Sequence, residues 1–412
     1  MANNHTQKAL VPLISISEAL ELLDKHIPLP QVETVDLLEA MGRIVAEPIE
    51  ATVDSPPYSN SAMDGFAVRW SELETLSGDH PVTLRIRGES QAGDPFHGEL
   101  TSGEAIRIST GAIMPDALDT VIPIEVCEVT DDTVTITAVK QQFQHVRYQG
   151  EEFQRGGHLL DPGVKLDVAQ LALLASQGVH KLPVYAQPRV AILVTGQELV
   201  PFDASAEPHQ LRDSNRPMLK AAVEATGGVV SLMTHVEDDL QATIQAIQDA
   251  EAAADIILLS GGVSMGAHDH VRPASQACGF EQVFWRINQK PGKPLFLAEK
   301  PDHVLLGLPG NPVSAFMCFQ HYGSRLIKRA GGDPTQPEVT PAAITHPLRN
   351  HGARTTMVRV QLTQGEDLTW RAQALKQQGS HMLTSISQAD GYFILEGRQE
   401  LNQGTSIDVI RF

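Results

Sequence analysis

The chain has 412 residues, 42% of them hydrophobic, which indicates a globular protein of roughly two to four domains. Its 50 Asp and Glu residues against 31 Lys and Arg residues give a formal net charge of −19. This charge argues against nucleic acid as a partner, because affinity for duplex nucleic acid comes from basic side chains that neutralise phosphates. An acidic protein can still bind an anion through a local group of cations and backbone N–H groups.

The N-terminal segment and the cysteines predict the compartment. Residues 1–10 are polar and lack the apolar core of a signal peptide, and no apolar stretch is long enough for a membrane span. Cys127, Cys278 and Cys318 are far apart and form no CxxC pair, so we expect three buried thiols and no zinc site. We therefore predict a cytoplasmic protein with no membrane partner.

The first part of the chain predicts a helical region interrupted by β structure. Residues 15–25 have the pattern of an amphipathic helix with Ser15 or Ser17 as its cap. Residues 66–148 contain short β-branched runs separated by Gly, Asp and Pro, which is typical of a small all-β domain. Residues 168–178 predict another helix that ends at a glycine. A helix on each side of the β-rich segment indicates that the β domain is inserted into a helical one.

Residues 188–331 alternate between predicted strands and predicted helices. A continuous apolar run, as a buried parallel strand requires, lies at residues 189–195, and further strands are predicted at residues 229–236, 255–260 and 303–308. Residues 313–330 predict a helix that begins after Asn311 and Pro312. This alternation predicts a doubly wound α/β domain. Short strands and turns in residues 334–412 predict a C-terminal β domain.

Three unusual loops follow predicted strands of the α/β domain, and ligands of such sheets bind at the carboxyl ends of the strands. In the first loop, Gly196 permits a close backbone approach and Glu198 offers a hard oxygen to a cation. By itself, a surface loop with one acid explains this segment equally well. In the third loop, Pro309, Asn311 and Pro312 begin a helix whose N-terminus favours an anion.

The second loop, residues 260–269, is rich in Gly and Ser and can present several backbone N–H groups to a phosphate. The residues that form this predicted cradle are Ser260, Gly261, Gly262 and Ser264. Asp269 adds a carboxylate where a Mg²⁺ ion that bridges phosphate oxygens would bind. His268 and His270 flank this acid, and their spacing in a loop favours solvated surface over metal ligation.

Lys290 and Lys293 lie in the segment KPGKP, whose prolines hold two ammonium groups in place and thereby favour phosphate or oxyanion binding. The loops together predict a site for a phosphorylated or nucleotide-bearing ligand with Mg²⁺. The sequence has no GxxxxGK[ST] and no GxGxxG segment, so ordinary ATPase and dinucleotide sites are not expected. It also has no GxSxG segment that would indicate a nucleophilic serine.

These motifs, in this order, resemble the molybdopterin molybdenumtransferase family, the MoeA and gephyrin E-domain group. The segments that carry the resemblance are PYSNSAMDG (57–65), STGA (109–112), GEE (150–152), SGGVSMGAHD (260–269), KPGKP (290–294), GLPGNPVSA (307–315), Arg354 and QGS (378–380). They span nearly the whole chain, and the combination is specific although each motif alone is not.

The resemblance implies a split helical N-terminal domain, an inserted β domain, a doubly wound α/β domain of the MogA type and a C-terminal β-barrel-like domain. The expected boundaries are 12–51 with 149–185, then 52–148, 186–333 and 334–412. It also implies a homodimer in which Asp64 of the inserted domain acts at the α/β site of the other subunit. Transient contacts with other cofactor-biosynthesis proteins or with apo-molybdoenzymes are expected as well.

The activity that the resemblance implies is transfer of molybdate onto the dithiolene of adenylylated molybdopterin, with Mg²⁺-dependent release of AMP. The expected catalytic residues are Asp64, Glu198 and Asp269, of which Glu198 and Asp269 would bind the metal. The expected substrate and anion contacts are Thr110, Ser260, Gly261, Gly262, Ser264, Lys290, Lys293, Pro309, Asn311, Pro312, Arg354 and Ser380. Because the pterin supplies two sulfurs of its own, the protein needs no thiolate ligands for molybdenum.

Two residues depart from the family pattern, and three alternative functions were weighed against the expected activity. The family commonly has TGDEL where this chain has TGQEL (195–199), so Gln197 replaces an aspartate. It commonly has GED where this chain has GEE (150–152), so Glu152 replaces an aspartate. An adenylyltransferase of the same α/β fold would need neither the split N-terminal domain nor the SAMDG segment. A scaffold protein would carry a further domain or a long linker. An inactive homologue that only binds stays open because of Gln197.

Overall fold

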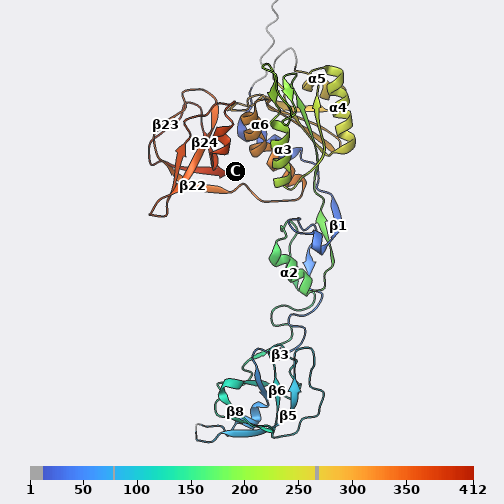
Figure 1. The fold of residues 1–412 in the computed structure, drawn as a ribbon, viewed down its shortest axis with the longest axis vertical. Helices are drawn as coiled ribbons and strands as arrows, with labels where there is room; N and C mark the ends of the chain where they lie inside the picture. Colours follow the sequence, from blue (N-terminus) through green and yellow to red (C-terminus); the bar gives the residue numbers. More distant parts are fainter. Residues whose placement is uncertain (1–12, 78, 265–268) are drawn as a thin grey trace, which may run out of the picture. The chain divides into compact units, whose positions relative to one another are not determined.

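The computed structural model describes residues 13–77, 79–264 and 269–412, and its elements are labelled in Figure 1. The polar N-terminal segment and His268, both considered in the sequence, lie outside these residues. The chain divides into two compact units. The first runs to Ala46 and includes Gly163–Asp167 and Leu182–Phe412, and the second comprises Glu47–Pro162 and Val168–Lys181. No helix in the described ranges is long and apolar enough to cross a membrane.

A six-stranded sheet in the order β16-β13-β17-β21-β20-β18 forms the centre of the first unit. Its strands are β13 (Arg189–Thr195), β16 (Val229–Val236), β17 (Ile256–Ser260), β18 (Glu281–Trp285), β20 (Phe296–Lys300) and β21 (His303–Leu308). β16, β13, β17 and β21 run parallel, whereas β20 and β18 pair antiparallel. The parallel strands confirm the apolar runs read in the sequence. The two antiparallel strands, β18 and β20, were not predicted from the sequence.

Helices cover both faces of this sheet, which confirms the doubly wound architecture. Alternate residues of β13 enter two different cores: Val190 and Ile192 one, Ala191 and Leu193 the other. The first core is covered by α1 (Ile16–Lys25), α3 (Asn215–Ala225), α6 (Pro312–Cys318) and α7 (Ser324–Ala330). The second is covered by α4 (Leu240–Ala253) and α5 (Val271–Ala277).

Helix α1 forms as its sequence predicts. The hydroxyl oxygen of Ser15 accepts a hydrogen bond from the N–H of Glu18 at 3.1 Å, which satisfies one of the free donors of the first turn. Ala19 and Leu23, four residues apart, are fully buried in the first core of the α/β sheet. Arg325 of α7 donates two hydrogen bonds, each of 2.6 Å, to Asp24, so α1 is also tied to that helix by a bidentate ion pair.

The C-terminal region is a closed five-stranded barrel, in which β24 pairs with both β25 and β26. Its elements are β22 (Val339–Ile344), β23 (Leu348–Arg349), β24 (Thr355–Gln364), β25 (Trp370–Ala374), α8 (Thr384–Ser387), β26 (Gly391–Leu395), β27 (Glu400–Leu401) and β28 (Ser406–Arg411). β19 (Gln289–Lys290) comes from the α/β part of the chain and pairs parallel with β24. This pairing attaches the KPGKP segment to the barrel.

One continuous helix was predicted over residues 313–330, and this prediction is wrong in its middle. A π-helical segment, Phe319–Gly323, separates α6 from α7. It places the Tyr322 hydroxyl 2.6 Å from Oε1 of Gln289 in β19, to which it donates. It also places Nδ1 of His321 2.7 Å from the Tyr392 hydroxyl in β26. Segments of this kind often occur at functional sites.

The second unit contains a six-stranded sheet in the order β7-β4-β6-β5-β9-β8, which confirms the all-β prediction for this stretch. Its strands are β4 (Gly65–Val68), β5 (Val82–Ser90), β6 (Glu104–Ile108), β7 (Thr120–Pro123), β8 (Cys127–Val129) and β9 (Thr133–Ile136). The other elements of the unit are β2 (Ile49–Glu50), β3 (Asn60–Ser61), η2 (Trp70–Leu73), η3 (Ile124–Val126), β10 (Val146–Arg147), β11 (His158–Leu160) and α2 (Val168–Ser176).

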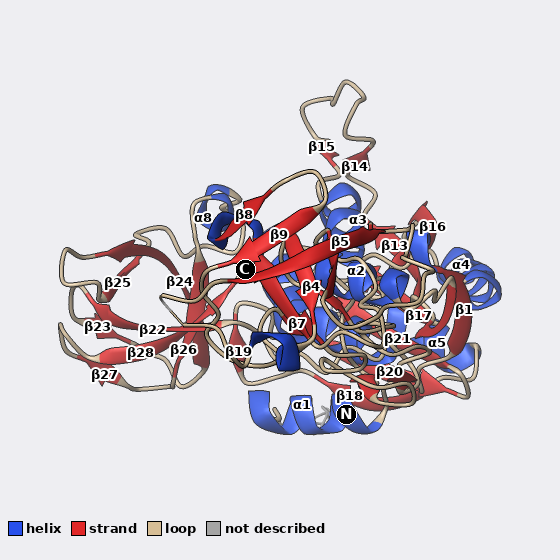
Figure 2. Cartoon of the chain, turned by 90° about the horizontal axis from the view of Figure 1, so that it is seen from below, coloured by secondary structure: helices blue, strands red, loops and turns tan. Residues whose placement is uncertain are grey.

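Short elements complete the first unit. They are β1 (Val32–Asp36), η1 (Leu37–Glu39), β12 (Lys181–Tyr185), β14 (Leu199–Val200) and β15 (Leu211–Arg212). β14 pairs with β15, and the segment between them extends away from the α/β sheet (Figure 2). The prediction of three buried thiols is correct only for Cys318, because Cys127 and Cys278 are partly exposed. Burial raises the pKa of the Cys127 thiol to about 11.

Candidate active site

The three predicted loops meet at the carboxyl ends of β13, β17 and β21. Gly261 adopts a φ of +100°, and a Cβ atom there would lie 2.5 Å from Oγ1 of Thr195. A Cβ at Gly310 would lie 3.5 Å from the Cα of Gly261. Only glycine permits the approach at position 261, because any side chain would collide with the end of β13. The glycine-rich loop is therefore held directly between the other two loops.

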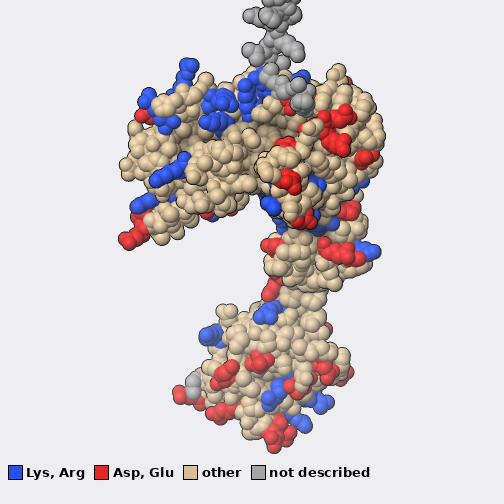
Figure 3. Space-filling model, turned by 45° about the horizontal axis from the view of Figure 1, so that its top comes forward, with Lys and Arg blue, Asp and Glu red and all other residues tan. Residues whose placement is uncertain are grey.

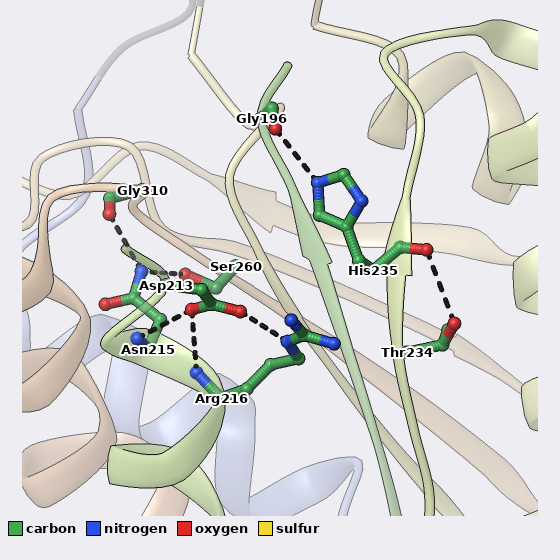
Figure 4. A network of polar contacts seen from close by, with 8 residues as sticks. All are labelled: Gly196, Asp213, Asn215, Arg216, Thr234, His235, Ser260 and Gly310. Atoms are coloured by element: carbon green, nitrogen blue, oxygen red, sulfur yellow. Dashed lines mark hydrogen bonds and ion pairs between the residues drawn. The ribbon is translucent and has the colours of Figure 1, made fainter. Parts of the chain in front are cut away.

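Asn215, at the start of α3, joins the second loop to the third (Figure 4). Its side-chain amide donates to Oγ of Ser260 at 2.9 Å and to the carbonyl oxygen of Gly310 at 2.8 Å. The Ser260 hydroxyl donates in turn to the carbonyl oxygen of Pro309 at 3.1 Å. Asp213 accepts hydrogen bonds from the N–H groups of Asn215 and Arg216, so it supplies the cap of α3. Asn215 lies outside the motifs identified in the sequence, although its residue type is typical of a helix N-cap.

The first loop is held by His235 and by Asp238. Nε2 of His235 lies 2.9 Å from the carbonyl oxygen of Gly196 (Figure 4). The Asp238 carboxylate accepts a hydrogen bond of 3.2 Å from the N–H of Gln197. Asp239 caps α4 through the N–H groups of its first turn, so Asp238 is left at the loop that contains Glu198. Both aspartates directly precede α4, and cap preferences alone do not distinguish them, so the sequence does not reveal the role of Asp238.

Carboxylates from three loops can offer oxygen ligands to a cation at this edge. Glu198 is exposed, and Asp238 and Asp269 are partly buried. Within the described ranges, no three His, Cys, Asp or Glu side chains converge as a preformed metal site. Mg²⁺ prefers hard oxygen ligands, retains several waters and commonly takes only one or two carboxylates plus substrate phosphates. The residues present fit Mg²⁺ on this chemistry, with a phosphorylated ligand supplying the remaining oxygens.

The KPGKP segment packs on a buried polar network centred on Gln289. The Gln289 side chain donates to the carbonyl oxygen of Gly292 at 3.0 Å and accepts from the Tyr322 hydroxyl. A Cβ atom at Gly292, whose φ is +84°, would lie 2.2 Å from the buried sulfur of Cys318. The loop between Lys290 and Lys293 is thus fixed by packing as well as by its prolines.

The barrel brings Arg354 and Ser380 to the same loops. The N–H of Thr355 donates to the carbonyl oxygen of Asn288 at 3.2 Å, directly before β19. Arg286, desolvation and Arg354 together hold the pKa of Lys293 below its usual value. The Asn311 amide lies 3.4 Å from Oγ of Ser380 and makes no cap hydrogen bond to α6. Figure 3 shows basic side chains gathered on the face of the unit that carries the barrel.

The structure also pairs the two predicted site residues of the second unit. Oδ1 of Asp64 accepts hydrogen bonds from the N–H of Thr110 at 2.7 Å and from its hydroxyl at 2.9 Å. The backbone donor and then the hydroxyl hold the pKa of the Asp64 carboxyl below its usual value. Glu152, one of the two departures, accepts a hydrogen bond from the Ser55 hydroxyl at 2.7 Å.

Thr110→Val is expected to raise the pKa of the Asp64 carboxyl, because it removes one of the two donors that stabilise the ionised form. The acid side of the pH–activity profile should then move to higher pH, since Asp64 becomes protonated earlier as the pH falls. NMR titration of the carboxyl measures the shift directly. Thr110→Ser keeps a hydroxyl and is the matched control. An unchanged Asp64 pKa in Thr110→Val would refute the stabilising role of the hydroxyl.

Comparison with known proteins accounts for nearly the whole chain. Residues 14–178 match the MoeA N-terminal region (domain I and II), residues 191–329 match a probable molybdopterin binding domain, and residues 341–412 match the MoeA C-terminal region (domain IV). A molybdopterin molybdenumtransferase of Nostoc is 36% identical over 80% of this chain and 78% of its own length. The chain belongs to the molybdopterin molybdenumtransferase family.

Two further relatives extend the family match over the full length. The molybdopterin molybdenumtransferase of Haemophilus influenzae is 32% identical over 97% of this chain and 99% of its own. The crystal structure of the molybdopterin biosynthesis MoeA protein of Pyrococcus horikoshii superposes with a TM-score of 0.85 at 29% identity, covering 97% of this chain and 99% of that one. The family resemblance inferred from the motifs is therefore confirmed.

Proposed function

We propose that this chain transfers molybdate onto the dithiolene of adenylylated molybdopterin and releases AMP in a Mg²⁺-dependent reaction. Its coarser role as a transferase of molybdenum cofactor biosynthesis follows from the family. In the finer reaction, two sulfurs replace two oxygens of molybdate, which leave as water. Water opens the phosphoanhydride, so AMP departs and the pterin keeps its own phosphate.

The observation that carries this proposal is the meeting of an N–H-rich loop, carboxylates and lysines at one sheet edge. Ser260 and Gly261 anchor the glycine-rich loop at this edge, where the N–H of Gly261 donates to the carbonyl oxygen of Leu308 at 3.1 Å. Gly262 and Ser264 follow them, and their backbone N–H groups would bind phosphate oxygens. Arg354 lies close enough to Lys293 to contribute to the lowered pKa of its ammonium group, so the two cations can serve one oxyanion site. Lys290 lies in the same Gln289-supported segment.

Mg²⁺, when bound, would stabilise the negative charge on the departing AMP. Glu198 and Asp269 would hold it, and Asp238 orders the loop that carries Glu198 through its hydrogen bond to Gln197. The neutral Gln197 side chain reduces repulsion toward anionic substrates compared with an acid at this position. We therefore propose that this chain is active rather than a binding-only homologue.

The proposal includes a homodimer in which Asp64 completes the site of the partner subunit. The dimer and the shared site are what the family resemblance implies; Asp64 and Thr110 belong to one compact unit and the α/β loops to the other. The Asp64 carboxylate is exposed and accepts both Thr110 hydrogen bonds through one of its oxygens, Oδ1. It is therefore available to orient a substrate or a bound cation.

AMP release from adenylylated molybdopterin, measured by chromatography with and without molybdate, tests the proposed function. We expect release that requires both Mg²⁺ and molybdate, together with a product that activates an apo-molybdoenzyme. Substrate that binds tightly and yields no AMP at any Mg²⁺ or molybdate concentration would contradict it. Activity that appears only after Gln197→Asp would assign this chain to the inactive homologues.

A further inference from the structure

Arg286 lies between β18 and β19, beside the KPGKP segment. Its N–H donates to the carbonyl oxygen of Leu295 at 2.9 Å, and the next residue, Ile287, donates to the carbonyl oxygen of Lys293 at 3.0 Å. The chain around Arg286 therefore runs alongside the chain that carries Lys293. Only 6% of Arg286 is exposed. Arg286 lies outside every motif identified in the sequence.

The charge of Arg286 is not balanced by an acid. Among the residues that the structure describes, its guanidinium forms no ion pair and no side-chain hydrogen bond, and its one recorded partner is the Trp285 ring, 5.5 Å away. Lys293 is a charged neighbour of Arg286, and Arg354 is in turn a charged neighbour of Lys293. Cations held beside one another repel unless an anion joins the group.

The backbone of Arg286 adds an independent indication. Its φ is +74°, in the left-handed region that side chains other than glycine adopt at an energetic cost. Residues held in such conformations cluster at binding sites, where the surrounding structure maintains the strain. A glycine would relieve the strain but would remove the charge.

We propose that Arg286 binds the oxyanion together with Lys293 and Arg354, as a third cation of one site for a tetrahedral dianion. The dianion is either free molybdate or a phosphoryl group of the nucleotide part of the substrate. The inference rests on the proposed function for the identity of these anions. Arginine suits this role because its planar donors can contact two oxygens of a tetrahedral anion at once.

Calorimetric titration of the full chain with molybdate alone, and separately with AMP alone, tests the inference and distinguishes the two sources. The variants are Arg286→Gln, which removes the charge at similar length, and Arg286→Lys, which keeps it. Arg411→Gln is the matched control, because Arg411 also lies near a tryptophan ring, Trp370 at 5.7 Å, but within the barrel. Thermal unfolding of each variant reports whether its fold is intact.

We expect Arg286→Gln to weaken the binding of one of the two anions by about tenfold or more, since a charge-assisted contact is lost. Arg286→Lys should retain most of the affinity, and Arg411→Gln should bind as the unsubstituted chain does. Equal affinities of Arg286→Gln and the unsubstituted chain for both anions would overturn the inference and leave the proposed function standing. If Arg286→Gln and Arg286→Lys lose anion affinity equally, Arg286 serves only to fold the segment, and the inference is likewise overturned. Failure of the unsubstituted chain to bind either anion would overturn the proposed function as well.

Discussion

Glu198→Ala and Asp269→Ala should each slow AMP release by on the order of a hundredfold or more at a fixed, low Mg²⁺ concentration. Both residues lie on loops at the carboxyl ends of the parallel strands, next to the glycine-rich loop that we propose binds phosphate. Each offers a carboxylate, and the described ranges contain no preformed cluster that could replace it. Loss of one oxygen ligand should therefore raise the Mg²⁺ concentration needed for half-maximal release.

The measurement is the initial rate of AMP release over a Mg²⁺ titration. Gln197→Asp is the matched variant, since it adds a carboxylate in the same loop as Glu198, beside Asp238. It should be tolerated and lower the Mg²⁺ concentration needed, because a further anionic ligand strengthens cation binding. A Mg²⁺ dependence that is identical in Glu198→Ala, Asp269→Ala and the unsubstituted chain would show that neither carboxylate binds the metal.

Mixing two inactive proteins, Asp64→Ala and Asp269→Ala, should restore about a quarter of the normal activity. If each site uses Asp64 from one subunit and Asp269 from the other, a heterodimer has one intact site and one doubly defective site. Random exchange makes about half of the dimers heterodimers, so about a quarter of all sites are intact. Asp64 and Asp269 belong to different compact units of the chain.

The control mixture is Glu198→Ala with Asp269→Ala. These residues lie in the same unit, so no heterodimer of the two contains an intact site and no activity should return. Subunit exchange is verified by differently tagged chains that purify together. Exchange without recovered activity in the Asp64 mixture would show that each subunit uses its own Asp64. Recovery in the control mixture would show that the assay does not isolate a shared site.

Local sequence determined the elements and the loops that could carry chemistry. The runs at Arg189–Thr195 and His303–Leu308 form β13 and β21 with the predicted bounds, because continuous apolar residues suit strands covered on both faces. Ser15 caps α1, and Pro312 begins α6 after Asn311. Once the strands are parallel, the loops that follow them must share one edge of the sheet.

Only the tertiary structure decided which side chains support that edge. The Asn215 side chain donates hydrogen bonds to both Ser260 and Gly310. Gly310 lies 95 positions after Asn215 in the chain, and no local sequence pattern predicts a contact over that separation. Asp238 and Asp239 are equivalent by sequence, and the cap geometry of α4 separates them.

The pairing of β19 with the barrel was equally hidden from the sequence. It brings Lys290 and Arg354 to one place through hydrogen bonds between segments far apart in the chain. The π-helical segment depends on Tyr322 and His321 reaching partners outside their own helix, so helical periodicity alone predicts a regular helix there. Local patterns record burial and backbone preference, whereas the composition of the site depends on long-range packing. For that reason the sequence identified the loops and their edge of the sheet, and the fold alone revealed Arg286 beside Lys293.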